Sequence, residues 1–183
     1  GFIITPLSSN MSRLHGGFNL YNVGFTAGLM GTLIVSLLKS FGIDIKQQLI
    51  LSSEYSEFFR NLLLSYFLLL IILGYLINNK SFKGYGKIFN YSGKLITDYT
   101  QLIGYGLTLV NMGIMGLICM SFVYITSGDF NGPVIGAIFT VVGFSSFGNN
   151  PGNSISIMVG VFLGGVLNIW DIQTTPIIIA GIF

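Results

Sequence analysis

Charged residues are confined to a few short stretches of this chain, and long apolar stretches separate them. No Lys, Arg, Asp or Glu occurs within residues 14–38, 61–79, 99–128 or 130–170. A single charge at the centre of a membrane-spanning helix costs about 2.5–3.5 kcal/mol, so charge-free stretches of this length are typical of segments buried in a bilayer. The pattern therefore predicts a series of hydrophobic helices.

Three of these stretches are long enough to cross a membrane as single helices, which takes about 20 predominantly apolar residues. The predicted spans are residues 18–38, 61–77 and 102–126. The second span is the most clearly apolar, because twelve of its residues are Leu, Ile or Phe. The first span has the required length but carries Asn19 and Asn22 in its opening turns.

The fourth charge-free stretch is interrupted by a polar run at residues 148–153, GNNPGN. Its two halves, residues 133–147 and 155–169, rise only 1.5 Å per residue as helices, so each is too short to cross a hydrocarbon core of about 30 Å. We expect Pro133 in the first turn of the first half and Asn153 or Ser154 as the N-cap of the second. Two half-length helices around a polar turn predict a broken or re-entrant helix pair.

Composition supports the same class of protein. Only 8% of the 183 residues are charged and 52% are hydrophobic, and the mean hydropathy is +0.79. A typical soluble domain carries about 25% charged residues, so this chain has too few to cover a water-facing surface. Soluble, disordered and nucleic-acid-binding proteins are excluded, and no nucleic-acid partner is expected at a net charge of +2.

We therefore predict an all-α, polytopic membrane protein, with one membrane domain over residues 1–183 and the lipid bilayer as its partner. It contains three long transmembrane helices, the broken helix pair and the start of a further segment. That last segment, from residue 176, stops after about half the length of a span. We interpret the chain as a piece of a longer protein.

The residue types that carry most enzyme and metal chemistry are scarce. His15 is the only histidine and Cys119 the only cysteine, so a metal site and an internal disulfide are not expected. The sequence has no G-x-S-x-G motif, no P-loop and no paired carboxylates within a span. We predict that the protein is not an enzyme and has no cofactor.

Two polar constellations in otherwise apolar sequence, residues 15–25 and 140–153, are the candidate binding elements. Irregular backbone in hydrocarbon is tolerated only where it is buried in protein or lines a watery cavity. The candidate solute-binding residues are Gly17, Asn19, Asn22, Gly143, Ser145, Asn149 and Asn153. The alternatives are a helix turn at the membrane interface for the first constellation and an ordinary extramembrane turn for the second.

These polar breaks favour a transporter or channel for a small, polar, uncharged solute, because discontinuous helices mark the binding sites of many transporters. The alternative is a non-transporting membrane scaffold or partner-binding subunit. In that case residues 80–94, which carry four Lys interleaved with aromatic residues, would dock a lipid or a protein at the interface.

Glycine is abundant, with 25 residues, and some glycines are spaced four apart within apolar stretches. The small-xxx-small pairs are Gly24/Gly28, Gly132/Gly136 and Gly160/Gly164. Such spacing puts two residues without side chains on one face of a helix, which lets another backbone approach closely. We predict close packing within the chain at these pairs, with contacts in a homo-oligomer as the second interpretation.

The stretch HGGFNLYNVGFTAG, from His15 to Gly28, resembles a family of uncharacterised bacterial membrane proteins, domain of unknown function 1576. Residues 143–164, in which NNP leads into IMVGV, are similar to the same family. The resemblance implies a multi-pass protein of a bacterial cell membrane that is longer than this chain. It implies no activity and assigns no functional residues.

Overall fold

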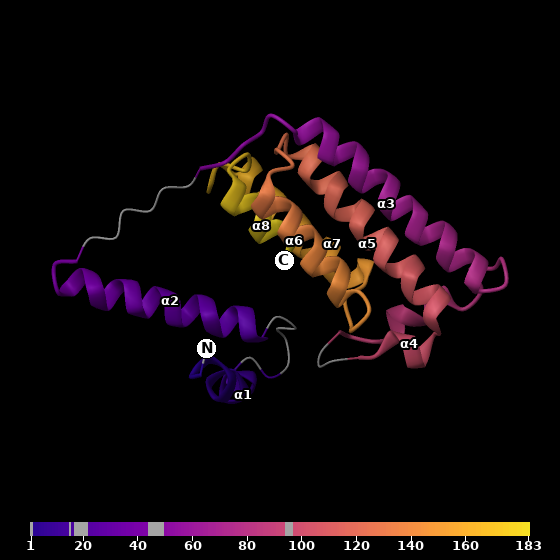
Figure 1. The fold of residues 1–183 in the computed structure, drawn as a ribbon, viewed down its shortest axis with the longest axis horizontal. Coiled ribbons are helices and arrows are strands. Elements are labelled where there is room, and N and C mark those ends of the chain that lie inside the picture. The colour runs from indigo at the N-terminus through magenta and orange to yellow at the C-terminus, as the bar shows by residue number, and fades with distance from the viewer. Residues whose placement is uncertain (1, 15, 17–21, 44–49, 94–96) are drawn as a thin grey trace. The chain divides into compact units, whose positions relative to one another are not determined.

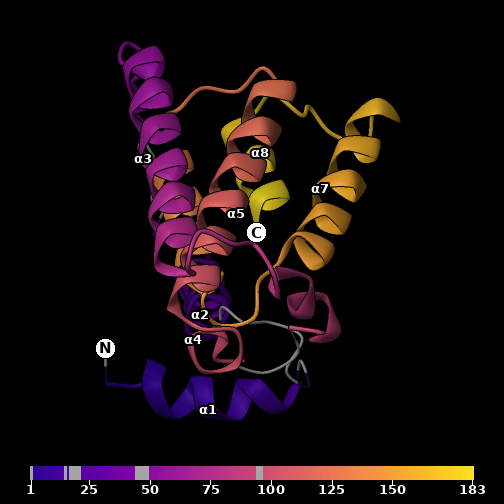
Figure 2. The same ribbon diagram turned by 90° about the vertical axis from the view of Figure 1, so that its right-hand side faces the viewer.

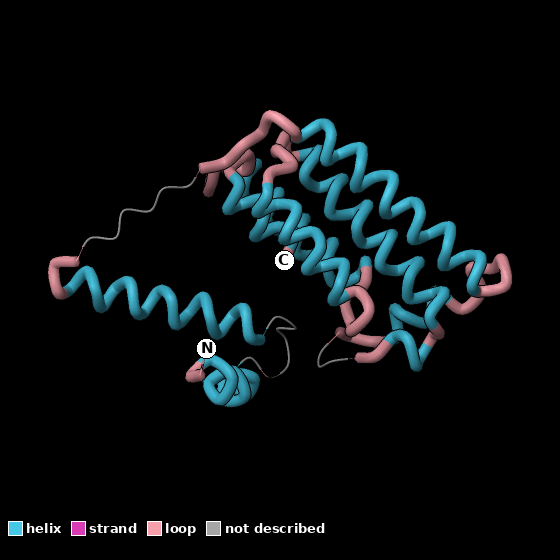
Figure 3. The backbone as a smooth tube through the Cα atoms, in the orientation of Figure 1, coloured by secondary structure: helices cyan, strands magenta, loops and turns pink. Residues whose placement is uncertain are grey.

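The computed structural model describes residues 2–14, 16, 22–43, 50–93 and 97–183. The regular secondary structure of these residues is helical, and loops connect the helices, with no strand among them (Figures 1 and 3). In chain order the helices are α1 (Ile4–Leu14), α2 (Asn22–Ser40), α3 (Ser56–Ile77), the 3-10 helix η1 (Tyr85–Asn90), α4 (Tyr99–Leu102), α5 (Tyr105–Ile125), α6 (Gly132–Phe144), α7 (Pro151–Val166) and α8 (Thr175–Ile182).

Three of these helices, α2, α3 and α5, are long and apolar enough to cross a membrane. The predicted fold class is therefore confirmed. The helices α6 and α7 are shorter and apolar, and a polar turn separates them. Contacts between residues divide the chain into two compact units, residues 1–50 and 51–183, and each is described by itself.

The first unit contains α2 and a short helix, α1, that the charge pattern did not predict. Figures 1 and 2 together show that α1 lies across the direction of α2. The two are tied by the side-chain amide of Asn22, whose Nδ2 donates to the Ser8 carbonyl at 2.8 Å. The apolar residues Ile4, Leu7 and Met11 recur at helical spacing on α1, and Arg13 lies opposite them, as is typical of helices at a membrane interface.

The second unit is built around α5, which contacts α3, α4, α6, α7 and α8. In the most apolar stretch of α5, 67% of the residues are buried inside the protein, whereas in the corresponding stretch of α3 only 17% are buried. A helix that is apolar on every side and covered by neighbours is the core of such a bundle. In Figure 2, α3 lies along one side of α5, while α7 lies on the other with α8 between them.

The contact between α3 and α5 depends on glycines. A Cβ added to Gly113 of α5 would lie 2.7 Å from the Phe67 carbonyl oxygen and 2.6 Å from the Ile71 side chain. A Cβ on Gly74 of α3 would lie 2.8 Å from the backbone nitrogen of Val110. Because real Cβ atoms do not come this close to backbone, any larger residue at these positions would push the helices apart.

The glycine pairs predicted from their spacing are not the ones that pack. A Cβ on Gly28, Gly132, Gly136 or Gly160 would meet nothing within 4 Å in the described part of the chain. The prediction of close intrachain packing is wrong at Gly132, Gly136 and Gly160, because the covered face of each helix is set by its neighbours and not by its glycine spacing. For Gly28 the finding applies only within the first unit, and the prediction stays open. Gly164 does pack, against the ring of Trp170. Contact with another copy stays a prediction.

Candidate functional site

The candidate site is the polar turn between α6 and α7, residues 145–150. Both helices that flank this turn have an asparagine as their N-cap. Asn131 caps α6, because its Oδ1 accepts from the Val134 amide at 3.1 Å, and Pro133 lies in the first turn as predicted. Asn150 caps α7 and forms a capping box with Asn153. The expected cap, Asn153 or Ser154, is therefore wrong.

The capping box explains why α7 begins earlier than the expected residue 155. The Asn150 Oδ1 accepts from the amides of Gly152 and Asn153, at 2.9 and 3.3 Å. The Asn153 Oδ1 in turn accepts from the Asn150 amide at 2.9 Å. Pro151 fits the first helical position because it has no amide hydrogen to satisfy. The helix can therefore start inside the polar run.

The polar turn lies against the first third of α5, while the other ends of α6 and α7 lie near the end of α5. The Phe130 amide, just before α6, donates to the Ser56 hydroxyl at the start of α3. The Asn131 Nδ2 donates to Thr175 at the start of α8, at 3.0 Å. The short helices therefore leave one end of the bundle and meet in a turn beside the first third of α5.

Asn111 of α5 holds the turn in place. Its Nδ2 donates to the carbonyl oxygens of Ser145 and Asn149, at 2.7 and 2.8 Å, and its Oδ1 accepts from the Tyr85 hydroxyl at 3.0 Å. Asn111 is completely buried, with an exposed fraction of 0%. One amide side chain thus links three separate segments, and each of its bonds satisfies a group that burial would otherwise penalise.

A second anchor is the hydroxyl of Tyr99, at the start of α4. It donates to the Gly148 carbonyl at 2.9 Å and accepts from the Asn150 Nδ2 at 3.1 Å. The backbone adds two bonds, from the Tyr99 amide to the Ser146 carbonyl and from the Thr97 amide to the Phe147 carbonyl, both 3.0 Å. The chain before α5 therefore covers the turn on the side away from α6 and α7.

Close approach at the turn requires glycine at two positions. Gly148 has φ of 132° and Gly93 has φ of 70°, both in the region that residues with a side chain rarely adopt. A Cβ on Gly93 would also lie 2.7 Å from the Gly148 carbonyl oxygen. The segment before α4 thus passes directly over the backbone of the turn.

The structure brings together four of the predicted site residues, Gly143, Ser145, Asn149 and Asn153, on one short segment. The Ser145 hydroxyl bonds the Val141 carbonyl within its own helix, at 2.7 Å. The Asn153 Nδ2 donates to the Gly148 carbonyl at 3.1 Å. Gly143 is half-buried, with space where a Cβ would be. The side chains of Ser145 and Asn153 thus bond groups within the protein.

The other three predicted residues belong to the first unit or lie outside the described residues. Asn22 belongs to the first unit and links α2 to α1. Gly17 and Asn19 lie outside the described residues. Their role in a solute site stays a prediction.

Four residues of the network were not among the predicted site residues: Tyr85, Tyr99, Asn111 and Asn150. Asn111 carries the clearest signal that was missed, because it is the only amide side chain within the predicted span 102–126. An amide in such a helix must find a partner. Tyr85 was interpreted as part of an interfacial segment and Tyr99 was assigned no role, because nothing in the local sequence distinguishes a buried tyrosine hydroxyl from an exposed one.

The network contains no ionised side chain. Burial raises the pKa of both Tyr85 and Tyr99, so their hydroxyls stay protonated and remain hydrogen-bond donors. The described residues contain no group of three or more His, Cys, Asp or Glu that could hold a metal ion. The chemistry available at the turn is therefore hydrogen bonding by neutral groups.

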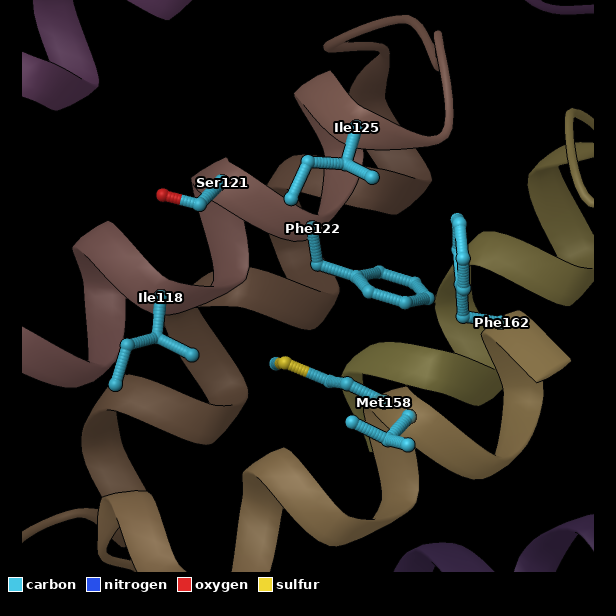
Figure 4. Close-up of a pocket in the computed structure, with 7 residues that line it drawn as sticks. Ile118, Ser121, Phe122, Ile125, Met158 and Phe162 are labelled. Atoms are coloured by element: carbon cyan, nitrogen blue, oxygen red, sulfur yellow. The ribbon is translucent and has the colours of Figure 1, made fainter.

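A separate groove lies between α5 and α7, with a volume of about 330 Å³ (Figure 4). It is lined by apolar side chains apart from Ser121, whose hydroxyl donates to the Leu117 carbonyl of its own helix at 2.8 Å. In Figure 4 the ring of Phe122 extends towards Phe162. This lining suits a hydrocarbon chain better than a polar solute.

The polar network falls within a region that a known family shares. The family described as "Protein of unknown function (DUF1576)" matches residues 1–40 and 77–183. The chain belongs to this family. The match includes every residue of the network, whereas the unmatched residues 41–76 contain all of α3 except its last residue. No curated protein and no solved structure is similar enough to match the chain.

Proposed function

We propose that this DUF1576 chain forms part of a membrane transporter or channel for a small, polar, uncharged solute. The observation that carries the proposal is the buried polar turn between α6 and α7. These helices have 13 and 16 residues, or about 20 and 24 Å, and fall short of a bilayer core of about 30 Å. A turn between such helices, inside the bilayer, is the kind of element on which transporters build their sites.

The proposed working element is the pair of carbonyl oxygens that Asn111 occupies. A solute with O–H or N–H groups offers the same donors to Ser145 and Asn149 as the Asn111 amide does. Solute binding would replace these two hydrogen bonds and release the turn from α5. In this proposal the structure, in which Asn111 bonds both carbonyls, is the latched state, that is, the state without bound solute. Tyr85 would favour relatching, because its hydroxyl holds the amide in the donating orientation.

The absence of ionised groups from the network supports an uncharged solute. A charged solute at this depth would lack a counter-charge from the side chains that form the network, which is costly in a bilayer. Neutral hydroxyl or amide groups need only hydrogen bonds, and the turn supplies them. The proposal involves no enzymatic step.

The test is solute-driven swelling of proteoliposomes that contain the full-length protein, with a panel of small neutral solutes and common ions. We expect flux of one class of neutral solute. Asn111→Leu should raise this flux, because the carbonyls of Ser145 and Asn149 are then free for the solute, and Tyr85→Phe should raise it less. Ser156→Ala is the matched control, because the exposed Ser156 hydroxyl bonds only its own helix, at Gly152, in the structure. Flux that is unchanged in Asn111→Leu would contradict the proposed latch.

A non-transporting scaffold is the second candidate, and one observation favours it. Within the described residues, each buried side-chain nitrogen and oxygen has a hydrogen-bond partner. A saturated network is what a purely structural clamp needs. A well-folded wild type that gives no flux above empty liposomes for any solute would support the scaffold.

A further inference from the structure

Two neighbouring pockets beside α3 and α5 share part of their lining and differ in polarity. Both are lined by Arg60, Tyr124 and Phe130. The first, of about 440 Å³, is otherwise lined mainly by polar groups, from Ser56, Ser127 and Asp129; we call it the polar chamber. The second, of about 540 Å³, is otherwise mostly apolar; we call it the apolar groove, and it includes Leu64, Leu117 and Met120.

The position of the two pockets follows the polarity profile of a bilayer. The polar chamber lies where α3 begins, at Ser56, and just beyond the end of α5, at Ile125. The apolar groove continues into the charge-free part of both helices, between Leu64 of α3 and Leu117 of α5. If α3 and α5 cross the membrane, the chamber is at headgroup level and the groove is at the level of the acyl chains.

The residues that line the polar chamber include one cation, Arg60, and one anion, Asp129. Arg60 supplies a guanidinium, which binds phosphate oxygens through two parallel hydrogen bonds. Its ion pair with Glu57, at 2.9 Å, is exposed and therefore exchangeable. Asp129 supplies a carboxylate, and its side chain is exposed at the chamber. One cation and one anion complement a headgroup that has both a phosphate and an ammonium group.

We propose that these two pockets together bind one glycerophospholipid with a phosphoethanolamine headgroup. Arg60 binds the phosphate, Asp129 accepts hydrogen bonds from the ammonium group, and an acyl chain lies in the apolar groove along Leu64, Leu117 and Met120. A primary ammonium has three N–H donors for the carboxylate, whereas a trimethylammonium has none. The site is separate from the polar turn and does not depend on the proposed transport function.

The experiment measures the lipids that stay bound to the full-length protein. The purified protein is equilibrated in mild detergent with an equal mixture of phosphatidylethanolamine, phosphatidylcholine and phosphatidylglycerol of identical acyl chains, and retained lipids are counted by native mass spectrometry. We expect phosphatidylethanolamine to dominate. Arg60→Gln should lower the retention of all three about tenfold, since a charge-assisted bidentate contact is lost. Asp129→Asn should keep phospholipid bound but remove the preference over phosphatidylcholine.

Control variants separate this site from general effects of charge and folding. Arg13→Gln and Asp171→Asn remove the same charges at residues that line neither pocket and should leave retention unchanged. Ser121→Phe partly fills the groove at an exposed position and should lower retention of every phospholipid without unfolding the protein. The proposal is overturned if wild type retains no lipid, if it prefers phosphatidylglycerol, or if Arg60→Gln and Ser121→Phe both leave retention unchanged.

Discussion

The two sides of α5 are held to their neighbours by different physics. On one side α3 packs against Gly113 and Gly116, where the nearest atoms belong to the Phe67 backbone and to the side chains of Phe67 and Ile71. On the other side Asn111 holds the polar turn through two hydrogen bonds, to the carbonyls of Ser145 and Asn149, and a third bond joins Asn111 to Tyr85 of η1. Inside a bilayer there is no hydrophobic force between helices, so close van der Waals contact and hydrogen bonds are the two available means of attachment. This protein uses both on one helix.

The two sides of α5 tolerate different substitutions. The glycine side depends on shape, so an added atom is costly whether it is polar or apolar. The Asn111 side depends on satisfied donors and acceptors, so a change that keeps the shape and loses the hydrogen bonds is costly. The following predictions test this contrast by changing one side at a time.

The largest effect is expected for Gly113→Leu. The new side chain would collide with the Phe67 carbonyl and with Ile71, and the helices α3 and α5 would have to separate. We expect a loss of about 3 kcal/mol in the free energy of unfolding, measured by denaturant titration in mild detergent. Gly136→Leu is the control, because its Cβ would meet nothing within 4 Å and should cost little. Equal losses in the two variants would show that glycine shape is not what holds α3.

Asn111→Leu comes next and addresses the polar side. Leucine is similar in size, but it leaves the carbonyls of Ser145 and Asn149 and the hydroxyl of Tyr85 without this partner. We expect a loss of about 2 kcal/mol in the same unfolding measurement. Hydrogen exchange should rise at the turn and stay unchanged along α3. Increased exchange along α3 as well would mean that the two sides of α5 are not independent.

A smaller effect is expected for Tyr85→Phe, which removes one hydroxyl and keeps the ring. The expected loss is about 1 kcal/mol, because a single hydrogen bond to Asn111 disappears. Combined with Asn111→Leu, the two losses should sum to more than the loss in the double variant, because both remove the same bond. Combined with Gly113→Leu they should simply add. Additive losses with Asn111→Leu would contradict the direct contact.

The smallest effect concerns Asp98, which caps α4 next to Tyr99. Its pKa is lowered, mainly because its carboxylate accepts a hydrogen bond from the Thr100 side chain, at 2.6 Å. A lowered folded-state pKa stabilises the protein above the unfolded-state pKa, and this stabilisation is lost as the pH falls through the folded-state pKa. Asp98→Asn should therefore lower Tm slightly at neutral pH and flatten the decrease of Tm below about pH 4. A steeper decrease in the variant would contradict this assignment.

Much of the architecture could be predicted from the sequence, because it depends on local properties. The long helices α2, α3 and α5 correspond to the charge-free spans, and the break between α6 and α7 lies at the predicted Gly, Asn and Pro run. Burying a charge in hydrocarbon is so costly that the absence of charge alone delimits a span. The helix α1 was not predicted, because it is short and amphipathic, and charge-free stretches indicate only helices that are apolar on every side.

The candidate site could be located only in part. Ser145, Asn149 and Asn153 were identified by the polar run in which they occur, but Asn111, which bonds Ser145 and Asn149, and Tyr99, which bonds Gly148 and Asn150, were not. The bonds that matter join residues 34 and 38 positions apart, from Asn111 to Ser145 and Asn149. No local pattern encodes such a pairing, because it depends on how far one helix is shifted and rotated against another.

The positions of charged and polar residues along the chain were thus enough to predict a bilayer environment, the long apolar helices and the place of the break. Each of these follows from the cost of putting charge or irregular backbone into hydrocarbon. Only the tertiary structure decided which glycines pack and which amides pair. Gly113 and Gly136 occur in similarly apolar helices, yet one meets the Phe67 backbone and the other meets nothing nearby. The reason is geometric: a contact needs two surfaces, and a single stretch of sequence describes only one of them.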